Sequence, residues 1–376
     1  MSRRLRAVRA ALAGLGAAAA LLAAAPAAAE HELGTSRLRD VSLVLQRMCE
    51  VQAVSSHETP LTRRIQSLLP QGLRSQVDGH GNLVVELGAG DPVVTFVAHQ
   101  DEIGYEIKGL EADGRATVVR RGGFYDWLLE GHPVVVGTAA GPVPAVVAPR
   151  PGYLDAKPDR EGVAPEDLRL DFGTDSWAAT GALGVKAGDP VTVVKRYDRL
   201  GAVRASARSM DDRCGCAALL LALQDLEGSR LSHRVRFVFS TEEELGLYGA
   251  EFAARAVPGA VCFAVDTFVS SDSPLENPRF ALAPLGEGCV VRAIDSSSIV
   301  RRADLERVRQ LAREAHVPLQ VGLTAGGNDG ARYVTEGAGD VPLGWPLRSS
   351  HSNSETVDLR DVSGLADLIT ELARRW

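Results

Sequence analysis

The sequence predicts an α/β protein, namely a three-layer sandwich with a mostly parallel central sheet and an inserted small β-barrel domain. Short Val- and Phe-rich runs alternate with longer stretches of helical periodicity, which is typical of buried parallel strands covered by helices. The middle of the chain breaks this alternation with many glycines and prolines. A length of 376 residues with 45% hydrophobic residues suffices for both parts.

Residues 1–29 are predicted to be a secretory signal peptide, separate from the fold. Four arginines precede an apolar Ala/Leu-rich run, and the small residues Ala27 and Ala29 fit a cleavage site. A membrane-spanning helix is the weaker reading because the run is short and rich in alanine. We therefore expect an exported protein, periplasmic or extracellular, with no membrane anchor after cleavage.

The α/β catalytic domain is predicted to comprise residues 30–106 and 200–376. Its strands are the apolar runs VVTFVAH (93–99), RVRFVFS (234–240), VCFAVD (261–266) and PLQVGLT (318–324). Its helices are the periodic stretches 212–227, 302–316 and 361–376.

Residues 107–199 are predicted to form the inserted β-domain. Short strands lie in HPVVVGT, PVPAVVA and DPVTVVKR, and helical periodicity is almost absent. Such strands leave edges that a second subunit can cover, so we expect this domain to mediate homo-oligomerisation.

Charge and cysteine content exclude some classes of protein. Removal of residues 1–29, which carry four arginines and no acids, changes the formal charge from −7 to −11. With no basic cluster elsewhere, nucleic acid is not an expected partner. Five cysteines are too few and odd in number for a disulfide scaffold, and Cys214 and Cys216 lie in an apolar run that favours a core role over a metal pair.

Ionisable residues follow the predicted strands. His99 and Asp101 come after the first strand, Glu242 to Glu244 after the second, and Asp266 closes the third. Asp211 and Asp212 begin a helix, and His351 precedes the last one. Because ligands bind at the carboxyl ends of strands in open α/β sheets, we expect these side chains to converge.

Each residue also has a simpler interpretation. His99 could be a hydrogen-bonded core histidine, Asp211 a helix cap, and Asp266 a turn residue. The glutamates could begin a solvated helix. Taken together these readings fail, because several strands would then end on an acid or imidazole by coincidence, and buried carboxylates need a counter-charge.

Two histidines and several carboxylates form a ligand set that suits zinc, cobalt or manganese. One cation would leave too many acids unpaired. Two divalent ions about 3.5–4 Å apart, bridged by a carboxylate, would neutralise them as in two-metal hydrolases.

Six segments carry a family resemblance: AHQDEIGY, SMDDRCGC, STEEELGLYGA, AVDTF, GGNDG and SHSNSETV. They resemble the signature blocks of the tetrahedral (TET-type) aminopeptidase family, which includes glutamyl, lysyl and deblocking aminopeptidases and some proteins called cellulase M. The segments GGFYDWLLEGHPVVVGTAAGPVPAVV and LRLDFGTDSWAATGALGVKAGDPVTV resemble the inserted β-domain of that family. The resemblance covers nearly all of the chain after residue 29, in the same order.

The resemblance implies a set of metal ligands. His99 and Asp266 would bind the first metal, Glu244 and His351 the second, and Asp211 would bridge both. The peptide bond between Asp211 and Asp212 is expected to be cis.

The resemblance also implies the catalytic groups. Asp101 would orient and polarise His99, and Glu243 would be the general base that takes a proton from the attacking water. Glu242 replaces a residue that is usually neutral in the family, and it is expected to face solvent. The usual GGTDA loop reads GGNDG here, so Asn328 and Asp329 are the expected substrate-binding residues.

The sequence therefore predicts an exported metallo-aminopeptidase that removes N-terminal residues from peptides, with two divalent ions, zinc above cobalt or manganese. The alternatives are another hydrolase on the same scaffold, such as a carboxypeptidase or deacetylase, and a catalytically silent peptide-binding protein. A glucanase would need only paired acids and no metal.

Overall fold

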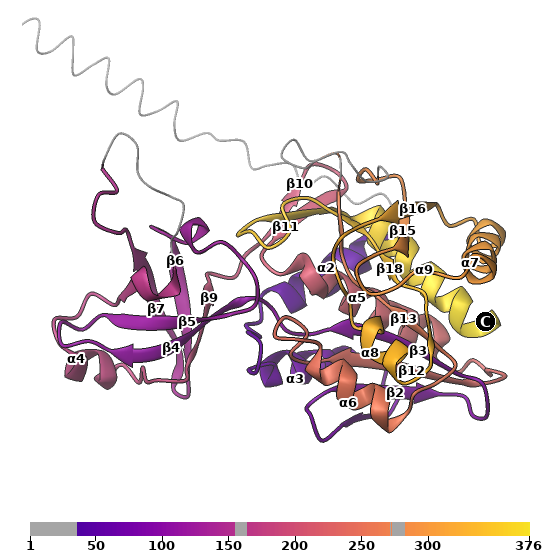
Figure 1. Cartoon of the computed structure of the whole chain (residues 1–376), viewed down its shortest axis with the longest axis horizontal. Coiled ribbons are helices and arrows are strands. Elements are labelled where there is room, and N and C mark those ends of the chain that lie inside the picture. Colours follow the sequence, from indigo (N-terminus) through magenta and orange to yellow (C-terminus); the bar gives the residue numbers. More distant parts are fainter. Residues whose placement is uncertain (1–35, 155–163, 271, 273–282) are drawn as a thin grey trace, which may run out of the picture. The chain divides into compact units, whose positions relative to one another are not determined.

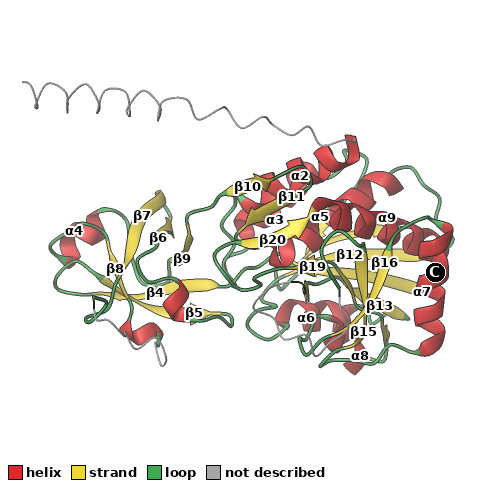
Figure 2. Cartoon of the chain, turned by 90° about the horizontal axis from the view of Figure 1, so that it is seen from above, coloured by secondary structure: helices red, strands yellow, loops and turns green. Residues whose placement is uncertain are grey.

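The central sheet lies between two layers of helices, as predicted (Figures 1 and 2). The computed structural model describes residues 36–154, 164–270, 272 and 283–376, so the predicted signal peptide, residues 1–29, lies outside the described residues. The six strands run in the order β1 (Ser75–Val77), β2 (Leu83–Leu87), β12 (Arg234–Ser240), β3 (Val93–His99), β13 (Val261–Ala264) and β17 (Gly339–Asp340). Pairing is parallel from β12 to β17, and β2 is antiparallel to both neighbours.

Helices cover both faces of this sheet (Figure 2). One layer contains α2 (Ser36–Cys49), α5 (Met210–Leu226) and α9 (Leu359–Arg375), which pack on one another. The opposite layer contains α6 (Tyr248–Ala256) and α8 (Gly330–Thr335). Two further helices, α3 (Thr59–Leu68) and α7 (Arg302–Glu314), pack on α2 and α9 respectively.

Aromatic side chains set the register of the three central strands. Phe96 on β3 lies opposite Phe237 on β12 and Phe263 on β13. Its ring centroid is 5.3 Å from that of Phe237 and 5.0 Å from that of Phe263, within the range of favourable aromatic pairs. This register brings the carboxyl ends of β3 and β12 level, with His99 opposite Ser240.

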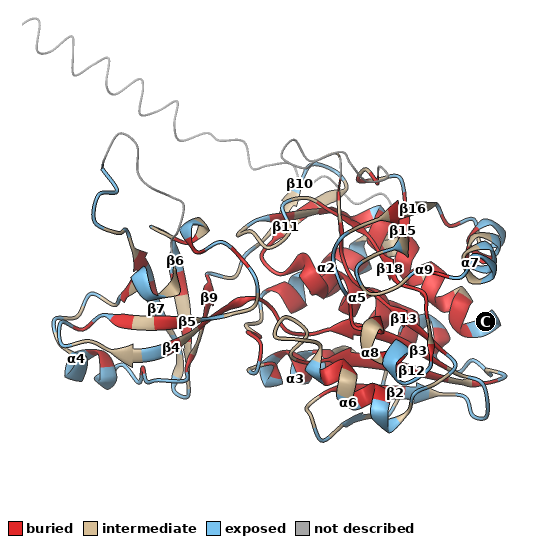
Figure 3. Cartoon of the chain, viewed as in Figure 1, coloured by how far each residue is buried: buried red, intermediate tan, exposed pale blue. Residues whose placement is uncertain are grey.

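Helix α5 is buried along most of its length because it packs against both the sheet and other helices (Figure 3). Cys214 and Cys216 are part of it and are buried, in keeping with their predicted core role. All five cysteines are buried and unpaired.

Smaller sheets complete the α/β part. They contain β10 (Tyr197–Leu200), β11 (Arg204–Ala207) and β20 (Glu355–Asp358); β16 (Leu319–Leu323), β15 (Cys289–Ile294) and β18 (Leu343–Gly344); and β14 (Phe268–Val269) and β19 (Pro346–Leu347). The strand predicted over 261–266 ends earlier, at Ala264, because Val265 bridges to Leu343 and the chain leaves the sheet before Asp266.

The predicted barrel is closed by six strands, in the order β4 (Gly104–Leu110), β5 (Ala116–Arg121), β8 (Arg169–Asp171), β7 (Gly141–Ala148), β6 (Pro133–Thr138) and β9 (Pro190–Val193). Its connections hold the 3-10 helices η1 (Asp126–Leu128) and η2 (Pro165–Asp167) and one short α-helix, α4 (Trp177–Ala182), which periodicity did not predict. Within the described ranges, no helix combines the length and the hydrophobicity that a bilayer crossing requires.

Candidate metal centre

The carboxyl ends of the parallel strands meet at one edge of the sheet and carry the predicted site residues. His99 is the last residue of β3, and the Gln100 amide extends the ladder by donating to the Ser240 carbonyl at 2.8 Å. Glu243 and Glu244 follow β12, and Asp266 follows β13. The predicted convergence is therefore present in the structure.

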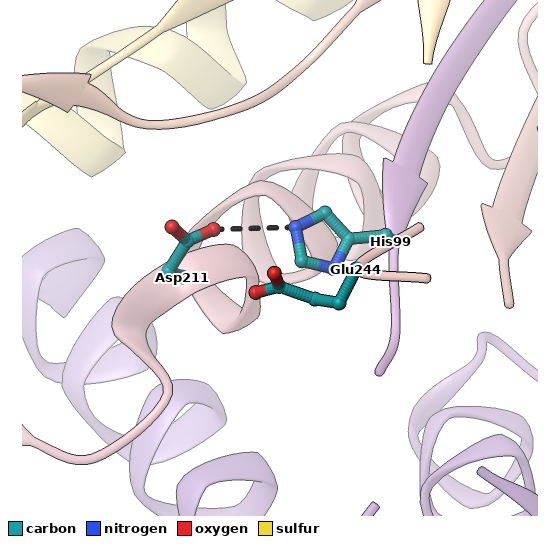
Figure 4. A group of neighbouring side chains, drawn as sticks. All are labelled: His99, Asp211 and Glu244. Carbon is teal, nitrogen blue, oxygen red and sulfur yellow. Dashed lines mark hydrogen bonds and ion pairs between the residues drawn. The ribbon is translucent and has the colours of Figure 1, made fainter. Parts of the chain in front are cut away.

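Three side chains form the centre of the site (Figure 4). His99, Asp211 and Glu244 each offer a ligand atom, and these atoms all lie within 4.8 Å of one another. Asp211 Oδ1 is 3.2 Å from His99 Nε2, while Oδ2 is 3.4 Å from His351 Nε2. The carboxylate of Asp211 thus presents one oxygen to each histidine, as a bridging ligand would.

His351 and Asp266 lie at the margins of this group. His351 Nε2 is 3.5 Å from Glu244 Oε1. Asp266 Oδ1 accepts a hydrogen bond from the Thr267 amide at 2.5 Å and is 3.5 Å from Arg292 Nη2. The structure therefore brings together four of the predicted ligands, His99, Asp211, Glu244 and His351, and it sets Asp266 back against Arg292.

Asp101 is buried next to the site and contacts three of its residues. Its Oδ1 is 3.4 Å from His99 Nδ1, which leaves Nε2 directed at Asp211. Its two oxygens also accept hydrogen bonds from the amides of Glu243 and Glu244, at 3.1 and 3.2 Å. One buried carboxylate therefore orients the first histidine and both glutamates, a wider role than the sequence predicted.

Asp212 anchors the start of α5 beneath the site. The peptide bond between Asp211 and Asp212 is cis, as expected. The Asp212 carboxylate accepts hydrogen bonds from the His99 amide and the Gly215 amide, both at 2.8 Å. This arrangement joins β3 to α5 and points the Asp211 side chain outward to the histidines.

Two groups that sequence reasoning missed fix His351. Its Nδ1 donates to the carbonyl of Gly123 at 2.6 Å, which leaves the lone pair of Nε2 facing Asp211 and Glu244. Glu355 accepts hydrogen bonds from the His351 amide at 2.8 Å and the Asp211 amide at 3.2 Å. Glu355 could have been identified from the sequence, because it is an acid four residues after His351. The carbonyl of Gly123 could not, because every residue has a backbone carbonyl.

The crowded acids make the site suited to cations. Burial, followed by the nearby charge of Asp211, raises the pKa of Glu244 to about 8, despite the lowering effect of His351. Burial and the charges of Asp266 and Glu244 likewise raise the pKa of Glu243 well above its usual range. Divalent ions between these groups would offset the repulsion, so the residues fit metal binding.

The three consecutive glutamates point in different directions. Glu242 is partly exposed, as expected, with 23% of its side chain accessible, but its carboxylate also accepts a hydrogen bond from Ser56 Oγ at 2.5 Å and lies 3.0 Å from His80 Nε2. In the described part of the chain, no hydrogen bond joins the Glu243 carboxylate to another residue, which leaves it available to exchange a proton.

The expected substrate-binding residues, Asn328 and Asp329, lie in a loop whose side chains are held by hydrogen bonds. The Asn328 side chain is buried and donates to Asp295 Oδ2 at 2.6 Å, while its oxygen accepts from the Gly330 amide at 2.8 Å. Asp329 accepts from Ser240 Oγ at the end of β12. Asn328 therefore shapes the loop from inside, while Asp329 is bonded to Ser240, the residue opposite His99 in the sheet.

We expect Gly122→Ala to damage the site and Gly131→Ala to affect stability alone. Both glycines have positive φ, +92° and +75°, so each alanine costs about 1–3 kcal/mol of strain. Only at Gly122 would the new Cβ clash with Ile103 and lie 3.3 Å from Glu244 Cβ, whereas nothing lies within 4 Å at Gly131. Metal content and kcat should fall for Gly122→Ala only; equal losses in both variants would contradict this.

Comparisons with known proteins identify a family for this chain. The model of the M42 glutamyl aminopeptidase family matches residues 81–368. A putative aminopeptidase, FrvX of Escherichia coli, is 28% identical over 87% of this chain and 93% of its own length. The glutamyl aminopeptidase of Lactococcus lactis is 26% identical over 84% of this chain and 91% of its own length.

Solved structures show the same fold. The TET1 peptidase of Pyrococcus horikoshii superimposes with a TM-score of 0.83 at 32% identity, covering 89% of this chain and all of its own. An aminopeptidase from Desulfurococcus kamchatkensis gives a TM-score of 0.84 at 25% identity, over 90% of this chain and 96% of its own. With the family match spanning most of the chain, the protein belongs to the M42 glutamyl aminopeptidase family of peptidases.

Proposed function

We propose that this protein is an exported, dinuclear-metal aminopeptidase that removes N-terminal residues from peptides. The observation that carries the proposal is the position of Asp211, with one carboxylate oxygen directed at His99 and the other at His351. A carboxylate between two imidazoles is suited to bridging two cations. The nitrogen and oxygen donors suit zinc, and also cobalt or manganese.

The roles of the side chains follow from their contacts. His99 and Asp266 would hold one cation, Glu244 and His351 the other, and Asp211 both. The bound ions would supply Lewis acidity towards the peptide carbonyl and towards water. Glu243 would accept the proton of the attacking water and return it to the leaving amine, while Asp101 keeps His99 and the glutamate backbone in place.

The test is a chelation and metal-readdition assay on a panel of aminoacyl substrates, each with an N-acetylated counterpart. We expect cleavage of free-amine substrates only, loss of activity with chelator, and recovery with zinc, cobalt or manganese. Cleavage that instead requires a free carboxyl terminus would indicate a carboxypeptidase, and release of acetate a deacetylase. Substrate binding without turnover would indicate a silent binding protein, and chelator-resistant glucan hydrolysis a glucanase.

Export and self-association are further parts of the proposal. The signal-like residues 1–29 support export, and the TET1 peptidase is described as assembling into a tetrahedron or an octahedral shell. Protein recovered outside the cytoplasm should begin near Glu30 and sediment as an oligomer. Cytosolic protein that retains Met1 or Ser2, or a monomer at all concentrations, would refute the corresponding part.

A further inference from the structure

A buried ionic group lies where the chain enters and leaves the barrel. Glu102 precedes β4, the first barrel strand, and Lys195 follows β9, the last one. The ammonium of Lys195 donates to Glu102 Oε2 and, at 2.9 Å, to Ser209 Oγ. Ser209 Oγ in turn donates to Glu102 Oε2, and Arg213 Nη2 lies 3.5 Å from Glu102 Oε1. We name these four residues the neck network.

The neck network is almost fully removed from water. The side chains of Lys195, Glu102 and Arg213 are 7%, 1% and 0% exposed. Burying ions is costly, and a buried ion pair is weak evidence of added stability, since apolar residues of the same size often serve as well. The proposed hydrolysis assigns no role to these residues, so another purpose is needed to explain them.

Two residues of the neck network, Ser209 and Arg213, lie on either side of Asp211 in the sequence. Ser209 lies two residues before Asp211 and has a φ of +71°, a conformation that costs energy for a residue other than glycine. Arg213 lies two residues after Asp211 and donates from Nη1 to the carbonyls of Gln100 and Asp101, at 2.7 and 3.2 Å. The segments before and after Asp211 thus both contact Glu102, through Ser209 and Arg213, and Glu102 is adjacent to Asp101 in the sequence.

We propose that Lys195 is a positioning residue for the metal centre, which acts through Glu102 and Ser209 to hold Asp211 between the two histidines. Lys195 is not a ligand itself, since its ammonium is bound to Glu102 and Ser209. Without it, Glu102 keeps Arg213 alone as a cationic partner, at 3.5 Å. The strained turn at Ser209 then loses a bond that holds it. This inference rests on the proposed metal binding, and not on the identity of the substrate.

The test compares Lys195→Met and Ser209→Ala with Lys108→Met. Lys108 lies on β4 and is exposed, so its replacement removes a barrel lysine of the same charge without touching the neck network. Zinc affinity is measured by competition with a chelator on metal-free protein, together with kcat, KM and thermal unfolding. We expect Lys195→Met and Ser209→Ala to bind zinc about 10–100-fold more weakly, as is typical for the loss of an outer partner of a metal ligand. At subsaturating metal, kcat should fall in parallel, while KM stays close to the parent value and Lys108→Met stays unchanged.

The outcomes separate positioning from plain structural support. Lower thermal stability with parental zinc affinity in Lys195→Met would overturn the proposal. If Lys195→Met does not fold, Ser209→Ala decides, because it keeps the Lys195–Glu102 ion pair: weaker zinc binding supports the proposal and parental binding overturns it. Zinc affinity that responds as expected in a protein without aminopeptidase activity would refute the proposed function and leave the positioning role in place.

Discussion

A Glu243→Gln variant is expected to keep its metal and to have a kcat about 10²–10⁴-fold lower than the parent enzyme. This range is typical for removal of a general base. Glutamine has the shape of glutamate but cannot take up a proton at neutral pH. The Glu243 amide would still donate to Asp101, so the turn that carries the ligand Glu244 should be preserved. Metal content measured beside kcat tests both parts of this expectation.

The neighbouring glutamates provide the controls. Glu244→Gln should weaken one metal position and make activity depend on added metal. Glu242→Gln should change little, because an amide can still bond to Ser56 and to His80. An inactive, metal-replete Glu242→Gln enzyme would shift the assignment by one residue, and full activity in all three variants would place the catalytic base elsewhere.

An Asp211→Asn variant is expected to lose bound metal and, with it, activity. The substitution turns one of the two oxygens into an amide group, which would face either His99 or His351 with hydrogens in place of a lone pair. The loss of affinity should exceed the roughly 10–100-fold typical for an outer partner, because a ligand shared by both ions is removed. Metal analysis after dialysis, followed by a zinc titration of activity, measures the effect.

Asp212→Asn is the matched control, because it makes the same substitution at the neighbouring position. Its carboxylate binds two backbone amides, so an asparagine must leave one of them facing an NH₂ group, at a cost of about 1–3 kcal/mol. We expect a lower melting temperature with residual metal binding. If Asp212→Asn lost metal as completely as Asp211→Asn with no change in stability, Asp211 would not be the bridging ligand.

The strand ends could be predicted because their signals are local. The runs 93–99 and 234–240 are apolar, rich in Val and Phe, and end on polar residues, and they coincide with β3 and β12. Parallel pairing then brings His99 and the residues after Ser240 to one edge. The separate roles of Asp101, Asp211 and Glu243 came from the family resemblance, since spacing alone did not distinguish one acid from another.

The remaining features depend on contacts between distant parts of the chain. The partners of Glu242 are Ser56 and His80, which no local pattern links to the glutamates. His351 donates to the backbone carbonyl of Gly123. Every residue has such a carbonyl, so the identity of residue 123 could not indicate this bond. No pattern in the sequence assigns a role to Lys195, and only the folded structure shows it buried against Glu102.

The carbonyl of Gly123 belongs to the connection between two barrel strands, yet it selects which nitrogen of His351 is free. The barrel and the sandwich are therefore not interchangeable modules. A chimera that exchanges the whole barrel for that of a relative would have to reproduce the backbone path through Gly122 and Gly123, or the imidazole would lose its fixed tautomer. An insertion in the connection between β5 and β6 should therefore disturb His351, because it would displace the Gly123 carbonyl.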